Sequence, residues 1–334
     1  MRARLTLTIG LVAVGTFMVQ TAGAAERLRA GIIGLDTSHS PAFTKILKAA
    51  PQGSELASVE IVAAYPGGSA DIPSSQSRVA GYVAEMRKLG VEIVDSVDKV
   101  LARSDVVLVE SVDGRPHLDQ AGAAIRAGKP VFVDKPVADN LAHAVAIYRL
   151  AAERKVPIFS SSALRFQKGI HSMRTDKRVG GVVGCQSYSP CEFEEHHVDL
   201  SWYGIHGVEN LFTIMGPGCV SVARAHTAGT DLAVGVWKDG RIGTFRGIRE
   251  GVGGHGATVF GRRGIVQSGG FDSYEPLVLE IVRFFHTGKP PVSAEETLEI
   301  YTFMEAADES RRQGGRPVKL ADVLSRAQQA AAAK

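Results

Sequence analysis

The sequence Lys129-Pro130-Val131-Phe132-Val133-Asp134-Lys135-Pro136 contains a short apolar run that ends at a proline. Residues 131–133 are β-branched and aromatic, and Pro136 lacks the N–H that a central strand needs, so we predict a buried strand that ends before the proline. In open α/β sheets, ligands bind just outside the carboxyl ends of the strands. We therefore predict that Lys135 is catalytic. The alternative is a surface salt bridge between Asp134 and Lys135.

Strand-like and helical patterns alternate on both sides of this run. Strands are expected over residues 28–34, 59–64, 91–94, 105–109 and 156–160, with helices between them. This alternation predicts a doubly wound parallel sheet with helices on both faces. After residue 162, strand-like runs at 181–188, 232–237, 242–246 and 258–260 follow one another closely with glycine turns between them, which predicts a mostly antiparallel open sheet. Helical patterns cover 200–215, 274–286 and 294–313.

The expected fold is therefore α/β with two domains, which also suits a length of 334 residues. An N-terminal Rossmann-like domain is expected over 26–160 and a C-terminal α+β domain over 161–320. An alanine-rich tail over 321–334 is expected to fray. The net charge of +3, with 45% hydrophobic and 22% charged residues, gives no reason to expect a nucleic-acid partner.

The first 25 residues have the pattern of a signal peptide. Arg2 and Arg4 precede an uncharged apolar run over 5–19, and the small-x-small sequence at 22–24 suits signal peptidase. We predict cleavage and a periplasmic or secreted protein. A membrane anchor is the alternative, but the run is shorter than the about 20 residues of a span, so no stable membrane insertion is expected after cleavage. Arg2 and Arg4 are not a twin-arginine pair.

Three cysteines, Cys185, Cys191 and Cys219, fit no metal-binding spacing. In an oxidising compartment, one disulfide among them is compatible with the sequence, and so are three buried free thiols.

The turn after the first predicted strand, residues 34–39, reads Gly-Leu-Asp-Thr-Ser-His. A dinucleotide-binding turn has glycines at three positions, so that the backbone approaches a pyrophosphate at a helix N-terminus. Here only Gly34 is present, and Asp36 stands where a phosphate would lie. Thr37, Ser38 and His39 can donate hydrogen bonds to phosphate oxygens. Alternatively, Asp36 or Ser40 caps the helix.

The second predicted strand ends without the acidic residue that binds ribose hydroxyls in NAD-binding folds. Ser69, Ser77 and Arg78 follow it and could contact a 2′-phosphate. If a dinucleotide binds, NADP is therefore as compatible with the sequence as NAD.

A second polar cluster lies in residues 192–209. His206 and Glu209 are three residues apart, which places them on one face of the predicted helix. A histidine beside a carboxylate suits proton transfer near neutral pH, and an ordinary salt bridge between the two is the alternative. The same region also offers a set of ligands for zinc or another divalent metal, namely His197, Asp199, His206 and Glu209.

Arg165 lies at the expected junction between the domains. Its guanidinium could hold a substrate carboxylate or hydroxyl, or form an interdomain salt bridge.

These motifs resemble those of the Gfo/Idh/MocA oxidoreductases over essentially the whole chain after residue 25. Residues 134–136 correspond to the family's Glu-Lys-Pro motif, with Asp134 in place of Glu. Residues 111–117 are similar to its Thr-Pro-Asn-x-x-His loop, and residues 202–209 to its Asp-x-Gly-x-His-x-x-Asp motif.

The resemblance implies catalysis by Lys135 and His206, assisted by Glu209. It implies that NAD or NADP contacts the residues at the ends of the first, fourth and fifth strands, namely Gly34, Asp36, Thr37, Ser38, His39, Ser111, His117, Asp134 and Pro136. It also implies a small carbohydrate substrate near Arg165, His197, Asp199 and Tyr203, and a homo-oligomer that pairs through the open face of the second-domain sheet.

The leading hypothesis is an exported NAD(P)-dependent oxidoreductase that acts on a sugar or polyol hydroxyl. Free dinucleotide is not expected outside the cytoplasm, which keeps a second hypothesis open. This is a non-redox sugar lyase or hydro-lyase on the same fold, which uses His206, Glu209 and a divalent metal. A third hypothesis is a carbohydrate-binding protein on an inactive enzyme scaffold.

Overall fold

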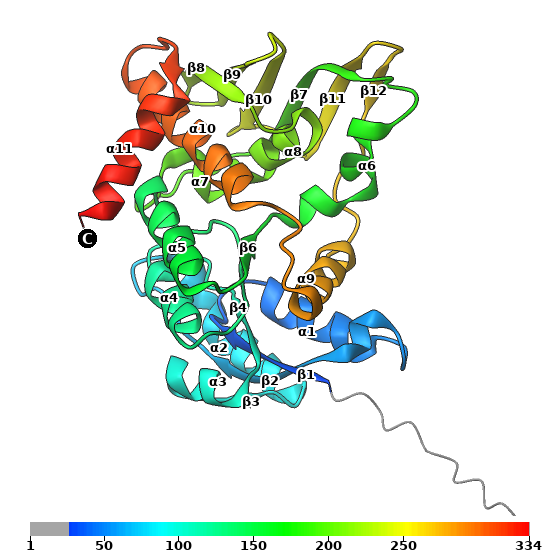
Figure 1. Ribbon diagram of the computed structural model, residues 1–334, viewed down its shortest axis with the longest axis vertical. Coiled ribbons are helices and arrows are strands. Elements are labelled where there is room, and N and C mark those ends of the chain that lie inside the picture. Colours follow the sequence, from blue (N-terminus) through cyan, green and yellow to red (C-terminus); the bar gives the residue numbers. More distant parts are fainter. Residues whose placement is uncertain (1–26, 334) are drawn as a thin grey trace, which may run out of the picture.

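The computed structural model describes residues 27–333, so the predicted signal peptide lies outside the described residues. The chain forms two sheets, each with its own helices, stacked along the long axis of the molecule (Figure 1). No helix within 27–333 has both the length and the apolar character needed to cross a membrane.

The first sheet is parallel and has six strands in the order β3-β2-β1-β4-β5-β6. These strands are β1 Leu28–Ile33, β2 Val59–Tyr65, β3 Glu92–Ile93, β4 Val106–Val109, β5 Val131–Val133 and β6 Ile158–Ser160. Between them lie α1 His39–Ala49, α2 Pro73–Lys88, α3 Val97–Arg103, α4 His117–Arg126 and α5 Leu141–Arg154. The predicted doubly wound domain is confirmed.

Alternation along β5 shows how this sheet is buried. Val131 and Val133 belong to the core that contains α4 and α5, whereas Phe132 belongs to the core on the opposite face with α1. Successive strand residues point to opposite faces, so an uninterrupted apolar run indicates a strand that is covered on both sides. The α1 face is completed by α9, Glu275–Thr287, which returns from the second half of the chain and packs Phe284 against Phe159.

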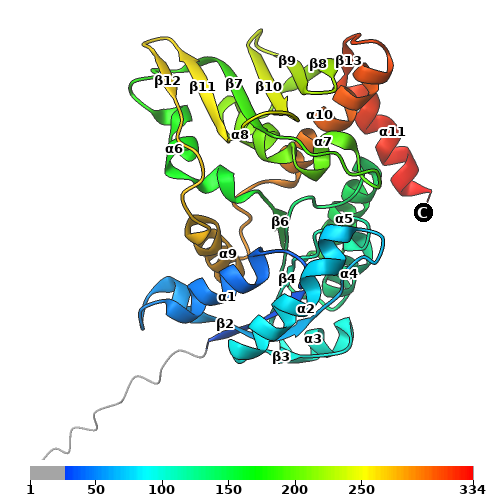
Figure 2. The same cartoon turned by 180° about the vertical axis from the view of Figure 1, so that it is seen from behind.

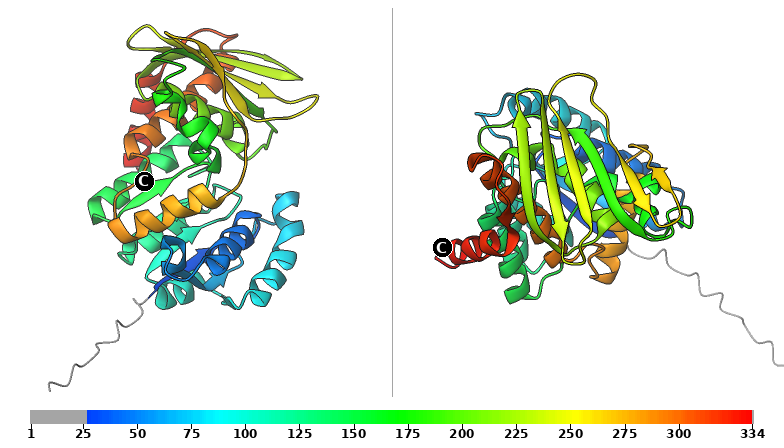
Figure 3. Two further views of the ribbon diagram at one scale, coloured as in Figure 1. Left: turned by 90° about the vertical axis from the view of Figure 1, so that its right-hand side faces the viewer. Right: turned by 90° about the horizontal axis from the view of Figure 1, so that it is seen from above.

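The second sheet has seven strands in the order β12-β11-β7-β10-β9-β8-β13. They are β7 Val182–Pro190, β8 Cys219–Thr227, β9 Thr230–Trp237, β10 Ile242–Ile248, β11 Gly256–Gly261, β12 Ile265–Gln267 and β13 Val318–Lys319. Only the β7–β10 pair is parallel among these strands, so the prediction of a mostly antiparallel sheet is confirmed. One face is covered by α8 Ile205–Met215 and α10 Ala294–Arg312, and the other face is open (Figure 3).

Two predictions about helices need correction. The helix expected over 200–215 is broken at residues 203–204 into α7 Asp199–Trp202 and α8. The tail expected to fray instead forms α11 Leu320–Ala332, which contacts α5 and buries Val323, Ala327 and Ala331 (Figure 2). Alanine-rich composition suggested a loose end, but these apolar residues recur at the three- and four-residue spacing of a buried helix stripe.

The three cysteines are buried free thiols, which decides between the two alternatives left open by the sequence. Burial raises the pKa of each thiol to about 12.

Candidate functional site

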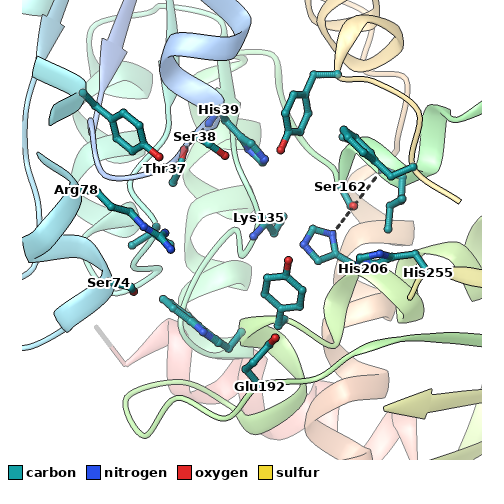
Figure 4. A pocket seen from close by; sticks show the side chains of 18 residues that line it. Thr37, Ser38, His39, Ser74, Arg78, Lys135, Ser162, Glu192, His206 and His255 are labelled. Carbon is teal, nitrogen blue, oxygen red and sulfur yellow. Dashed lines mark hydrogen bonds between the residues drawn. The ribbon is translucent and has the colours of Figure 1, made fainter. Parts of the chain in front are cut away.

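A cavity of about 760 Å³ lies between the two lobes, outside the carboxyl ends of the first sheet. Its walls come from the start of α1, the first half of α2, the turn after β5, the segment after β6, and the start of α8. Figure 4 shows Lys135 and His206 pointing into this space from different lobes. The predicted convergence of these two residues, which are far apart in the sequence, is therefore present.

His206 is the second residue of α8, and its Nδ1 lies 2.7 Å from Ser162 Oγ. Its ring packs edge-on against Tyr203 at 4.9 Å and against His255 at 5.7 Å between ring centroids. Burial and then the positive charge of Lys135 hold the pKa of His206 well below its usual value. The imidazole is therefore neutral near pH 7 and able to accept a proton.

Lys135 lies at the turn after β5, with its Nζ 5.5 Å from the centre of the Tyr203 ring. Burial lowers the pKa of Lys135, and the carboxylates of Asp134 and Glu110 partly oppose this shift. Asp134 is buried and accepts the backbone N–H of Lys135 at 2.8 Å. Asp134 and Pro136, predicted as cofactor contacts, do not line the cavity. They flank Lys135 in the chain, at the turn after β5.

Of the residues predicted to contact a cofactor, Thr37, Ser38 and His39 line the cavity. Gly34 does not. Its φ is +101°, and a Cβ there would lie 2.3 Å from the backbone N of Ser111, so glycine is required for close packing of the β1 and β4 ends. Ser111 and His117 are also away from the cavity. The Ser111 hydroxyl donates to Gln120 Oε1, and His117 Nε2 lies 2.9 Å from the Ser111 carbonyl oxygen.

Asp36 is fully buried and neither lines the cavity nor caps α1. Its carboxylate accepts hydrogen bonds from the backbone N–H of Val112 at 3.0 Å and from the Ser75 hydroxyl at 2.7 Å. Burial raises the pKa of Asp36. The carboxylate thus joins the β1 turn to the segment after β4 and to the start of α2. The alternative that Ser40 caps α1 is also wrong, because its hydroxyl donates to the Gly34 carbonyl oxygen.

Segment 66–72, which connects β2 to α2, lies over the same edge of the sheet. The Leu35 N–H donates to the Pro66 carbonyl oxygen at 2.7 Å, and the Ser69 hydroxyl donates to Asp113 at 2.5 Å. Gly67 is close to both Gly34 and Ser111. In a dinucleotide-binding fold, the pyrophosphate and adenosine occupy this crevice. The β1 turn at this edge has one of the three glycines of a dinucleotide-binding turn, and its Asp36 carboxylate is held by Val112 and Ser75.

Of the three residues considered for a 2′-phosphate, only Arg78 lines the cavity. Ser69 is bonded to Asp113, and Ser77 is exposed on α2.

Glu209 has a different environment from the one predicted. Its carboxylate accepts hydrogen bonds from the Ser161 hydroxyl at 2.5 Å, the Ser162 N–H at 2.7 Å and Arg165 Nε at 2.7 Å, and it lies outside the cavity lining. Neither the expected catalytic position nor the alternative salt bridge with His206 is present. Arg165 is buried and also pairs with Glu296 at 2.8 Å, so it forms ion pairs between elements instead of facing a substrate.

The predicted metal ligands are not brought together. His197 Nε2 accepts the Gly114 N–H at 2.9 Å, and Asp199 pairs with Arg224 and Arg249 at 2.6 and 2.7 Å. Neither residue lines the cavity, which also corrects their prediction as substrate contacts. Tyr203 is the one predicted substrate residue on the cavity wall.

Several cavity residues were missed by sequence reasoning, among them Ser74, Tyr82, Glu192, Trp202, His255 and Tyr274. Glu192 and Trp202 lie within the polar cluster noted over 192–209, and Tyr274 begins the helical pattern expected over 274–286, but none of the three was assigned to the site. His255 follows a glycine-rich turn, and a lone histidine there was its only signal.

Comparison with known proteins identifies similar folds and a related segment. Residues 28–162 match the model of an oxidoreductase family with an NAD-binding Rossmann fold. The chain is 37% identical over 114 residues to an inositol 2-dehydrogenase from Cereibacter sphaeroides, which covers 33% of this chain and 29% of that relative. The match thus spans less than a third of the relative's length.

Among solved structures, a scyllo-inositol dehydrogenase from Lactobacillus casei with bound NAD(H) and scyllo-inositol superimposes with a TM-score of 0.70 at 16% identity, covering 89% of this chain and all of that one. A myo-inositol 2-dehydrogenase from Lactobacillus plantarum gives a TM-score of 0.71 at 17% identity, covering 88% of this chain and 99% of that one. At these identities, the similarity shows the fold alone.

Proposed function

We propose a function on the premise that this chain belongs to the Gfo/Idh/MocA family of oxidoreductases. The protein is an enzyme that acts on a sugar or polyol in the cavity between its lobes, with Lys135 and His206 as the catalytic residues. The names of the inositol dehydrogenases to which it is similar support this substrate class.

The observation that carries the proposal is the convergence of two groups with complementary proton chemistry. His206 is neutral and can take a proton from the substrate, while the Lys135 ammonium can stabilise or protonate the oxygen on which negative charge develops. The Tyr203 ring lies 5.5 Å from the Lys135 Nζ, and this cation–π contact favours the charged form.

Two reaction classes use these groups. Elimination from a sugar or polyol needs only a base and an acid, and the buried, hydrogen-bonded Asp36 carboxylate at the β1 turn, where a dinucleotide-binding fold has a glycine, favours this non-redox class. Oxidation of a hydroxyl needs NAD or NADP to accept hydride, and family membership favours this class. Because the β1 turn has only one of the three glycines of a dinucleotide-binding turn, we derive no step through a dinucleotide.

Lys135→Met tests the shared part of the proposal. Loss of the ammonium should reduce turnover of a sugar, polyol or sugar-acid substrate by roughly 10²–10⁴-fold. The matched control is Lys177→Met, at an exposed position outside the cavity. Equal activity of the two variants would remove Lys135 from the mechanism.

The reaction class is tested on the purified full chain by mass spectrometry, ultraviolet absorbance and NAD(P)H titration. Nucleotide that copurifies or binds at micromolar concentration supports the dehydrogenase. Turnover of a sugar substrate with no nucleotide bound supports the lyase.

Export is a further part of the proposal, supported by the pattern of residues 1–25. Protein recovered from a periplasmic fraction should begin near residue 26. A protein with its original N-terminus that remains in the cytoplasm would contradict export.

A further inference from the structure

Three side chains from the carboxyl ends of β1, β4 and β5 meet beneath the cavity. They are His39 at the start of α1, Glu110 directly after β4, and Asp134 directly after β5. One potential ligand atom of each lies within 4.8 Å of the other two. The parallel sheet produces this meeting, because neighbouring parallel strands end at the same edge.

Glu110 is the unusual member of the group. It is fully buried, and neither carboxylate oxygen has a hydrogen-bond partner among residues 27–333. One of these oxygens lies 4.0 Å from His39 Nδ1. Burial and the neighbouring Asp134 carboxylate raise the pKa of Glu110 well above its usual value. The nearby Lys135 ammonium opposes this shift but does not hydrogen-bond Glu110. Burying a carboxylate without a hydrogen-bond partner is costly, so a cation that binds it directly would relieve this cost.

The other two members are already oriented. Asp134 Oδ2 lies 2.6 Å from His39 Nδ1, while its Oδ1 accepts the Lys135 N–H. The His39 ring is held between Phe43 and Tyr274, at 5.2 and 4.7 Å between ring centroids. His39 also lines the cavity, so an ion bound there has a path to solvent.

From this geometry, we propose that His39, Glu110 and Asp134 bind a divalent cation at the floor of the cavity. One imidazole nitrogen and two carboxylates suit Mn²⁺ or Zn²⁺ better than Mg²⁺ or Ca²⁺, which prefer oxygen ligands alone. Metal–ligand bonds are about 2.0–2.2 Å long. To form them, His39 and Asp134 separate slightly, and each binds the ion in place of the hydrogen bond between them.

This site differs from the ligand set predicted from the sequence. It also goes beyond the proposed function, because it assigns a role to Glu110, which the acid–base scheme does not use. The ion would provide a fixed positive charge next to Lys135, and open ligand positions on the cavity side. Its presence can be measured without any turnover.

The test uses the purified full chain, freed of metal by a chelator and then titrated with MnCl₂ or ZnCl₂. The readouts are bound metal by elemental analysis, the Mn²⁺ electron paramagnetic resonance signal and thermal unfolding. We expect one ion per chain and an increased melting temperature. Loss of a residue that only hydrogen-bonds to a metal ligand lowers metal affinity by about 10–100-fold. Glu110→Gln removes a direct ligand, so it should weaken binding at least that much.

Glu192→Gln is the matched control, because Glu192 lines the cavity but lies outside the cluster. It should leave the affinity unchanged. His39→Gln provides a second ligand variant, in case Glu110→Gln does not fold. A wild-type chain that binds neither metal, or equal affinities for the ligand variants and Glu192→Gln, would overturn the proposal. Either result would leave the tests of Lys135 unaffected.

Discussion

At the scale of single residues, the protonation state of His206 links the site to stability. The pKa of this histidine is well below its usual value because the side chain is buried near Lys135. An unfolded histidine binds a proton near pH 6.5, whereas the folded one stays neutral. Below that pH the unfolded state therefore binds more protons, and the free energy of unfolding falls as pH falls.

We therefore predict that His206→Gln flattens the pH dependence of unfolding. Between pH 7 and pH 5, the free energy of unfolding should fall less steeply with pH in the variant than in the wild type. The difference in slope corresponds to the uptake of up to about one proton on unfolding. The slope should not vanish, because His117 and His255 also have lowered pKa values. Urea unfolding at several pH values measures this. The same decline in the free energy of unfolding in both proteins would contradict this prediction. The control is His286→Gln, at an exposed position.

Lys135 and His206 could be predicted from the sequence because local patterns position them. An apolar run ending in a proline places Lys135 at a strand end, and a three-residue spacing places His206 and Glu209 on one face of a predicted helix. The partners of Asp36 and Glu209 could not be predicted, since Val112, Ser75 and Arg165 reach them from segments distant in sequence. Buried carboxylates require hydrogen-bond donors, but the sequence does not say which ones.

At the scale of elements, the Arg165–Glu209 pair joins the segment after β6 to α8. Both side chains are buried, and Arg165 extends the connection to Glu296 on α10. This pair therefore holds His206 in position through α8 without touching the cavity.

Glu209→Gln should accordingly destabilise the fold. Removal of one partner from a buried ion pair lowers the free energy of unfolding by about 3–5 kcal/mol. The control is Glu280→Gln, which breaks the surface pair with Arg283 and should lower it by less than about 1 kcal/mol. Urea unfolding compares the two variants. Below the unfolding transition, kcat of Glu209→Gln should stay within about tenfold of wild type, far less than a lost general acid or base costs. A stable but inactive Glu209→Gln protein would restore the catalytic role predicted from the sequence.

Element boundaries were predicted best where periodicity was strong, as in α10, which was expected over 294–313 and spans Ala294–Arg312. The break between α7 and α8 was not predicted because an apolar helical pattern continues across it. The cap and packing of α11 depend on α5, so composition alone suggested a loose tail where the tertiary contact stabilises a helix.

At the scale of the whole molecule, the open face of the second sheet suggests an interface between two copies of the chain. The strand register aligns Val236, Ile242, Gly184, Phe260 and Ile265 in one row across five strands. The four side chains in this row are exposed by 37%, 52%, 40% and 68%, on the face opposite α8 and α10. A continuous exposed apolar row is typical of an association surface.

We therefore predict a homodimer that pairs through this face. Ile242→Glu combined with Phe260→Glu places two charges in the middle of the row, and burying unpaired charges in an interface is costly, so the double variant should be monomeric. Light scattering coupled to size-exclusion chromatography measures the mass. Val252→Glu, on a loop and 95% exposed, is the control and should remain dimeric. A monomeric wild type, or a double variant that still pairs, would show that this face is not the interface. The cavity is formed within one chain, so the monomeric variant should keep its ligand and metal binding.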